Sequence, residues 1–194
     1  MIGRKFIFIH IPRTGGTSLE RILLSLEGIA NWDELASKKV VDQCVGAEKH
    51  FRASRVQALV GAQHWQKALK LSIVRNPFDK VISHYFQPYY RAINALSGHS
   101  LDFFLDAYAP APHEDGKTCN DYLDREMDVI IRYENYDHEL LSILEPFGVK
   151  PSQLRTRIGA VRERTGYQGY YSRHAKQIVE NLYKEDLERF NYVF

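Results

Sequence analysis

A run of glycine and polar residues near the start of the chain has the composition of an anion-binding loop. It reads His10-Ile11-Pro12-Arg13-Thr14-Gly15-Gly16-Thr17-Ser18. Two consecutive glycines allow a tight turn and a close approach of the backbone to a ligand. The hydroxyl side chains add hydrogen-bond donors, and Arg13 adds a permanent positive charge. The pattern predicts a site for phosphate or sulfate, although an ordinary glycine turn capped by Thr17 would also explain it.

The segments on either side of this loop have the character of a strand and a helix. Residues Lys5–Ile11 form a continuous β-prone run, and Leu19–Leu26 has its apolar residues at helical spacing. A helix beginning after the loop would offer free N–H groups and the positive end of its dipole. The loop lacks the Gly-Lys-Ser/Thr ending of the Walker pattern, so it is not a conventional nucleotide P-loop.

A second candidate anion site combines Arg75 and Ser83. Arg75 follows the apolar run Leu71–Val74, and Pro77 is well placed to begin the next helix. Ser83 falls about two helical turns further on. Because ligands of parallel α/β sheets gather at the carboxyl ends of the strands, the two side chains could hold a second phosphate. The alternative is a surface arginine and an unrelated helical serine.

The order of the predicted elements favours an α/β fold. Strands are expected at Lys5–Ile11, Val56–Gly61, Leu71–Val74 and Val129–Arg132. Helices are expected at Leu19–Leu26, Phe78–Phe86, Tyr136–Phe147 and Arg173–Phe190. Strands alternating with helices indicate a central parallel sheet flanked by helices on both faces. We expect a single domain over residues 1–194, with residues 87–120 as a loop-rich insertion on the acceptor side.

Composition and charge exclude several classes of protein. The 194 residues include 26 Lys and Arg against 24 Asp and Glu, so we expect no nucleic-acid partner. Cys44 and Cys119 lack the spacing of a disulfide framework or a metal site, and the histidines show no zinc pattern. We therefore expect no metal. The first apolar run is too short for a membrane helix, which favours a cytoplasmic protein without membrane insertion.

The two anion-binding motifs resemble those of the sulfotransferases, in the carbohydrate-modifying, heparan-sulfate-type branch. The loop Arg13–Ser18 is similar to the family's 5′-phosphosulfate-binding loop, and Arg75 with Ser83 is similar to its 3′-phosphate-binding motif. The segment Ile131-Arg132-Tyr133-Glu134-Asn135 and the last helix also resemble family landmarks. The resemblance implies a P-loop-like three-layer α/β fold. It also implies 3′-phosphoadenosine 5′-phosphosulfate (PAPS) as donor and 3′-phosphoadenosine 5′-phosphate (PAP) as product.

For these positions the resemblance implies specific roles. Arg13, Thr14, Gly15, Gly16, Thr17, Ser18, Arg75 and Ser83 would bind the donor nucleotide. A hydroxyl of the acceptor, expected to be a saccharide, would attack sulfur in line without a metal. Arg13 departs from the lysine usual in the family, and it would stabilise the leaving phosphate electrostatically but not donate a proton to it. A PAP-binding pseudoenzyme is therefore one alternative, and a P-loop kinase of a small hydroxylated molecule is another.

The general base is expected to be His64, with Arg13 as the other catalytic residue. His64 follows the predicted strand Val56–Gly61, where the resembling branch often carries a histidine base. An imidazole is suited to removing a hydroxyl proton at neutral pH. His10 is the competing candidate, and His84 is expected to face away from Ser83.

Two further groups of residues are candidates for substrate contacts. Tyr89, Tyr90 and Arg91 in the insertion could stack on sugar rings and meet an acidic group, or could pack the insertion onto the domain. Arg162, Arg164 and Gly166 could form a loop that covers the nucleotide, or a solvated basic loop.

Overall fold

The computed structural model describes residues 1–29, 50–87, 98, 100–107, 118–154 and 166–194. Within these ranges three strands form one parallel sheet in the order β1-β2-β3. The strands are β1 (Phe6–Ile9), β2 (Leu69–Val74) and β3 (Val129–Arg132). Ile9 pairs with Ser72, and Val74 pairs with Arg132, so all three strands end at one edge of the sheet. We call this edge, followed by the anion-binding motifs, the carboxyl edge, and the opposite one the amino edge.

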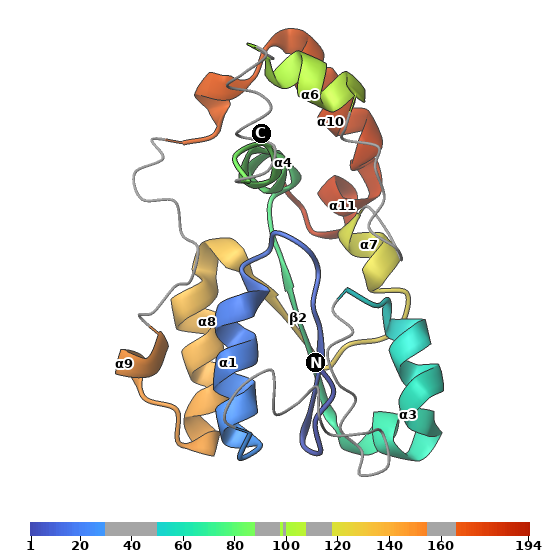
Figure 1. The fold of residues 1–194 in the computed structure, drawn as a ribbon, viewed down its shortest axis with the longest axis vertical. Coiled ribbons are helices and arrows are strands. Elements are labelled where there is room, and N and C mark those ends of the chain that lie inside the picture. Colours follow the sequence, from blue (N-terminus) through green and yellow to red (C-terminus); the bar gives the residue numbers. More distant parts are fainter. Residues whose placement is uncertain (30–49, 88–97, 99, 108–117, 155–165) are drawn as a thin grey trace.

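Both faces of the sheet are buried, as the apolar strands predict. Phe6 and Phe8 of β1 point into one core, whereas Ile7 and Ile9 point into another. The first core is covered by α1 (Gly16–Leu26), α8 (Tyr136–Leu144) and α9 (Pro151–Leu154). The second is covered by α3 (Ala53–Lys67) and α7 (Cys119–Tyr122), on the other side of the sheet in Figure 1. Each fully buried large apolar side chain contributes about 1.5–3 kcal/mol, so the sheet is a rigid base for the loops at its edges.

A third apolar cluster lies beyond the carboxyl edge. It is formed by α4 (Pro77–Tyr85), α6 (Leu101–Ala107), α10 (Arg173–Leu182) and α11 (Lys184–Arg189). Helix α4 begins directly after β2, with Asn76 as N-cap accepting from the Phe78 N–H at 3.0 Å. Figure 1 shows this cluster above the sheet, with the last residues of the chain beside α4. Short 3-10 turns complete the described structure, at Tyr133–Asn135, Glu145–Phe147 and Gln168–Tyr170.

The predicted strand at Val56–Gly61 is wrong, because this segment is part of α3. Ala53 and Val56 are buried, whereas Leu59 is 43 % exposed, and that spacing is helical rather than alternating. Gly61 has φ 76° and kinks the helix instead of ending a strand. The final predicted helix is also divided, since Tyr183 separates α10 from α11.

Candidate functional site

The loop between β1 and α1 is held in place by its own hydrogen bonds. The buried Thr14 hydroxyl donates to the Ile11 carbonyl at 2.9 Å, and the Ser72 hydroxyl of β2 donates to the Ile9 carbonyl at 2.9 Å. Arg13 and Gly15 both adopt the left-handed backbone conformation, with φ of 64° and 84°. For arginine this conformation is strained, and such residues persist where the surrounding structure fixes them.

The two glycines of the loop allow close approaches that any side chain would block. A Cβ on Gly15 would lie 2.7 Å from the ring of Tyr133, which follows β3. A Cβ on Gly16 would lie 2.5 Å from the ring of His10. These contacts bring the ends of β1 and β3 against the start of α1 and leave no room for a side chain at either glycine.

Helix α1 begins at the loop, and its first turn faces the carboxyl edge. This turn contains Gly16, Thr17 and Ser18 and no acidic residue. The unpaired N–H groups of a helix start and its dipole favour an anion, typically by 0.3–1 kcal/mol. Gly16, Thr17 and Ser18, which were predicted to bind phosphate, therefore lie together at one helix start, and their binding role stays a prediction.

The second motif is brought into direct contact with the first. Arg13 Nη2 donates to Ser83 Oγ at 2.9 Å and to the Ser83 carbonyl at 2.8 Å. Arg75 Nη1 donates to the Arg13 carbonyl at 3.1 Å. Arg75 also binds Asp79 Oδ2 through Nε at 2.8 Å and through Nη2 at 2.6 Å, and its guanidinium lies 4.1 Å from the Tyr133 ring centre. Two guanidinium groups, a hydroxyl and a helix start thus converge at the carboxyl edge.

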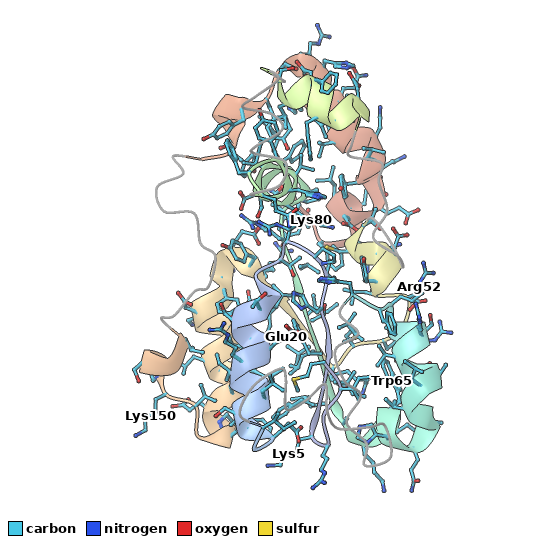
Figure 2. All side chains as sticks on the ribbon, viewed as in Figure 1. Lys5, Glu20, Arg52, Trp65, Lys80 and Lys150 are labelled. Atoms are coloured by element: carbon cyan, nitrogen blue, oxygen red, sulfur yellow. The ribbon has the colours of Figure 1, made fainter. Side chains whose placement is uncertain are left out.

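Two histidines lie at the same edge. His10 is buried, and its Nδ1 is 2.8 Å from Oε1 of Glu20, a residue on the face of α1 turned toward β1 (Figure 2). His50 is half-buried, and its Nδ1 is 2.8 Å from the His10 carbonyl. The two rings are 4.7 Å apart. A carbonyl can only accept, so His50 Nδ1 carries the proton and, in the neutral ring, Nε2 is the basic nitrogen.

His64 is not brought to this site. Its Nε2 donates to the Gly3 carbonyl at 2.9 Å, and Gly3 in turn pairs with Phe6 at the first residue of β1. His64 therefore lies at the amino edge, separated from the loop by the length of β1, about 3.3 Å per residue. Its expected position depended on the strand at Val56–Gly61, which is a helix.

The last residues of the chain are bonded to the junction of β2 and α4. Asn76 donates from its side chain to the Val193 carbonyl at 2.8 Å and from its backbone to Glu134 Oε1 at 2.8 Å. Tyr192 donates to the other oxygen of Glu134 at 2.9 Å. Since Asn76 follows Arg75, these bonds fix the backbone that carries the second motif.

Some candidate residues fall outside the described residues or away from the site. Tyr89, Tyr90, Arg91, Arg162 and Arg164 lie outside the described residues. Gly166 is described and has φ 64°. His84 packs its ring edge-on against Phe104 of α6, 5.8 Å away.

Sequence reasoning assigned no role in the site to His50, Glu20 or Asp79, and it named Tyr133 only within a segment that resembles a family landmark. The signal for Asp79 was present, because an acid four residues after Arg75 on a helix can pair with it. His50 and Glu20 contact His10 only through the fold, because each lies on a different segment of the chain. No sequence spacing predicts these contacts.

A sulfotransferase family model matches residues 3–101, just over half of the chain, and the chain belongs to this family. The matched part contains the glycine loop, His50, Arg75 and Ser83. No curated protein and no solved structure matches the chain. Family membership supports sulfuryl transfer in general, and the parallel sheet flanked by helices is consistent with it. Among the helices of the described residues, none is long and apolar enough to cross a membrane.

Proposed function

We propose that the protein transfers a sulfuryl group from PAPS to a hydroxyl of a saccharide acceptor. The observation that carries the proposal is the contact between the two anion-binding motifs, Arg13 to Ser83 and Arg75 to Arg13. A donor with phosphate groups at its 5′ and 3′ positions needs two anion sites a few ångströms apart. Two guanidinium groups beside a helix start supply them. The saccharide rests on the resemblance of the loop to the carbohydrate branch.

In this proposal the loop Thr14–Ser18 holds the 5′-phosphosulfate in a P-loop-like manner. Backbone N–H groups at the start of α1 and the hydroxyls of Thr17 and Ser18 would donate to it. Arg75 and Ser83 would hold the 3′-phosphate. Both are buried, so their interactions with a charged ligand are screened less than at an open surface.

The reaction needs a base and a stabilised leaving group. An acceptor oxygen forms a bond to sulfur while the bond from sulfur to the bridging oxygen of PAPS breaks. The hydroxyl proton goes to the base, and PAP leaves with the bridging oxygen. Negative charge grows on the 5′-phosphate as the bond breaks, and the helix start stabilises that charge without reorganisation.

We assign the base to His50 rather than to His64. His50 lies at the carboxyl edge, and its bond to the His10 carbonyl leaves Nε2 as the nitrogen that would accept a proton. His10 is the weaker candidate because its Nδ1 faces the Glu20 carboxylate and its Nε2 lies against Gly16. The position of His10 suits a residue that supports the loop and orients His50.

A PAP-binding protein without transferase activity is the second candidate. It is favoured by the arginine at position 13, where the resembling family has lysine. A guanidinium is not deprotonated in proteins and cannot protonate the leaving oxygen.

A binding measurement followed by a transfer assay distinguishes the active sulfotransferase from the PAP-binding protein without activity. We expect calorimetry to show PAP binding in preference to ATP, and radiolabelled PAPS to label at least one of a panel of hydroxylated saccharides. PAP binding with no transfer to any acceptor would favour the pseudoenzyme. Preference for ATP would overturn both candidates.

A further inference from the structure

The backbone and the side chain of Arg13 belong to different parts of the site. Its backbone lies in the glycine loop, with φ 64°, and its carbonyl accepts from Arg75. Its side chain leaves the loop and reaches the seventh residue of α4, where Nη2 donates to both oxygens of Ser83. The guanidinium therefore lies with the residues that we propose for the 3′-phosphate.

Several contacts fix the direction of the Arg13 side chain toward Ser83. The left-handed conformation of Arg13 is held between the Thr14 bond to Ile11 and the Arg75 bond to the Arg13 carbonyl. Arg75 is itself oriented by Asp79 and by the face of Tyr133. Ser83 is 6 % exposed, so the guanidinium meets it inside the protein rather than in solvent.

We propose that Arg13 determines specificity for the 3′-phosphate, which it would bind together with Arg75 and Ser83. The inference rests on the proposed function and refines it, because the glycine loop then supplies a residue to each end of the nucleotide. In the bound state the 3′-phosphate would receive hydrogen bonds from Ser83 Oγ and from both guanidinium groups. Stabilisation of the leaving 5′-phosphate falls to the helix start and the hydroxyls of α1.

The chemistry of the guanidinium supports this role. Its donors form a planar fork that can contact a phosphate and a neighbouring hydroxyl at once, whereas a lysine offers one ammonium on a flexible stem. Both bonds to Ser83 come from one nitrogen, Nη2, so the other guanidinium nitrogens of Arg13 could still donate to a phosphate, whereas lysine would have a single nitrogen for both partners. Arg13→Lys therefore keeps the positive charge at position 13 and removes the guanidinium, so it tests which of the two matters for binding the 3′-phosphate.

The test compares two ligands that differ only in the 3′-phosphate, PAP and adenosine 5′-phosphate. Their dissociation constants are measured by calorimetry for the wild type, Arg13→Lys, Ser83→Ala and the double variant. We expect Arg13→Lys to weaken PAP at least about tenfold and adenosine 5′-phosphate less than about threefold. The double variant should lose less than the product of the two single losses, since the residues share one contact.

Thr17→Ala is the matched control, because Thr17 is in the same loop but belongs to the start of α1. It should weaken the two ligands by the same factor. Circular dichroism and thermal unfolding would establish that each variant is folded.

If Arg13→Lys weakened both ligands equally, Arg13 would act on the 5′-phosphate that they share, and the assignment to the 3′-phosphate would be overturned. Unchanged PAP binding would overturn it as well. Both results leave the proposed function intact, provided that the wild type binds PAP in preference to ATP. A wild type that binds neither ligand would instead overturn the proposed function, and the assignment with it.

Discussion

The two edges of the sheet contain histidines with nearly the same hydrogen bond and different surroundings. At the carboxyl edge, His50 bonds to the His10 carbonyl at 2.8 Å, and at the amino edge His64 bonds to the Gly3 carbonyl at 2.9 Å. Both bonds fix a tautomer, so the bond alone does not distinguish a catalytic histidine from a structural one. The two histidines differ in their surroundings, because His50 contacts His10, the first residue of the glycine loop, whereas His64 contacts the segment before β1.

The amino edge is organised for stability instead. Lys70 binds Asp128 at 2.7 Å and its ammonium lies 5.8 Å from the ring of Trp65, which Figure 2 places between α3 and the sheet. Lys70 also donates to the carbonyls of Trp65 and Ala68 at 3.3 and 3.2 Å, so its contacts link β2 to the start of β3 and to the end of α3. The comparison predicts that changes at the carboxyl edge alter chemistry and ligand binding, and that changes at the amino edge alter unfolding.

The largest effect is expected from His50→Asn. Asparagine tolerates the left-handed conformation of His50, φ 72°, so the turn should be retained while the base is lost. We expect turnover to fall by about two to four powers of ten with PAP affinity unchanged, and the acidic limb of the pH–rate profile to disappear. Steady-state kinetics with radiolabelled PAPS and calorimetry with PAP would measure the two quantities.

His10→Asn is the comparison variant for this experiment. If it removed the acidic limb while His50→Asn kept near-native turnover, the base would be His10 and not His50.

Arg75→Ala should have the next largest effect, on nucleotide binding. Removing a buried charged partner of a phosphate costs about 2–5 kcal/mol. PAP should therefore be weakened far more than adenosine 5′-phosphate, which lacks the 3′ group. Calorimetry with the two nucleotides checks this, and similar losses for both would remove Arg75 from the 3′ site.

His64→Ala should act on stability and not on turnover. It leaves the buried Gly3 carbonyl without its donor, at a cost of about 1–3 kcal/mol in the free energy of unfolding. Denaturant unfolding measures that cost, and His64→Gln, which can still donate, should recover part of it. A loss of turnover beyond about tenfold in a folded His64→Ala protein would contradict the division between the two edges.

Much of this fold could be predicted from local patterns. The strands β1, β2 and β3, the glycine loop, and Pro77 at the start of α4 follow from apolar runs and from residues with restricted backbones. The segment at Val56–Gly61 could not be assigned in this way, because a short apolar run fits a buried strand and a helix equally. Helix spacing becomes visible only over the longer range from Ala53 to His64.

The candidate site was predictable where its residues lie at a strand end or on the helix that follows, and not where they meet only through the fold. Thr14–Ser18, Arg75 and Ser83 were predicted to bind ligand because strand ends and helix starts gather ligands, and that role stays a prediction. His50 and Glu20 became candidates only through their contacts with His10. The turn of the Arg13 side chain toward Ser83 depends on a backbone conformation that no sequence pattern indicates.

The smallest effect is expected from Asp128→Asn, at the amino edge. Burial alone would raise the pKa of the Asp128 carboxyl, but the hydrogen bonds from the Lys70 side chain and backbone, and the charge of Lys70, together lower it. A carboxyl whose pKa is lower in the folded state adds stability above its unfolded pKa, about 3.9. That contribution is lost as the pH falls through the folded pKa.

The wild type and Asp128→Asn should therefore differ in Tm by no more than about 2 °C at neutral pH, because the Asp128 side chain is 43 % exposed and its ion pair is screened. The difference should stay constant from about pH 7 to pH 5 and shrink below about pH 4. Thermal unfolding across this range measures it, and turnover at neutral pH should be unchanged. A difference that grew as the pH fell would mean that Lys70 does not hold the carboxylate in its charged form. A change in turnover would mean that the amino edge is coupled to the site, and the contrast between the two edges would fail.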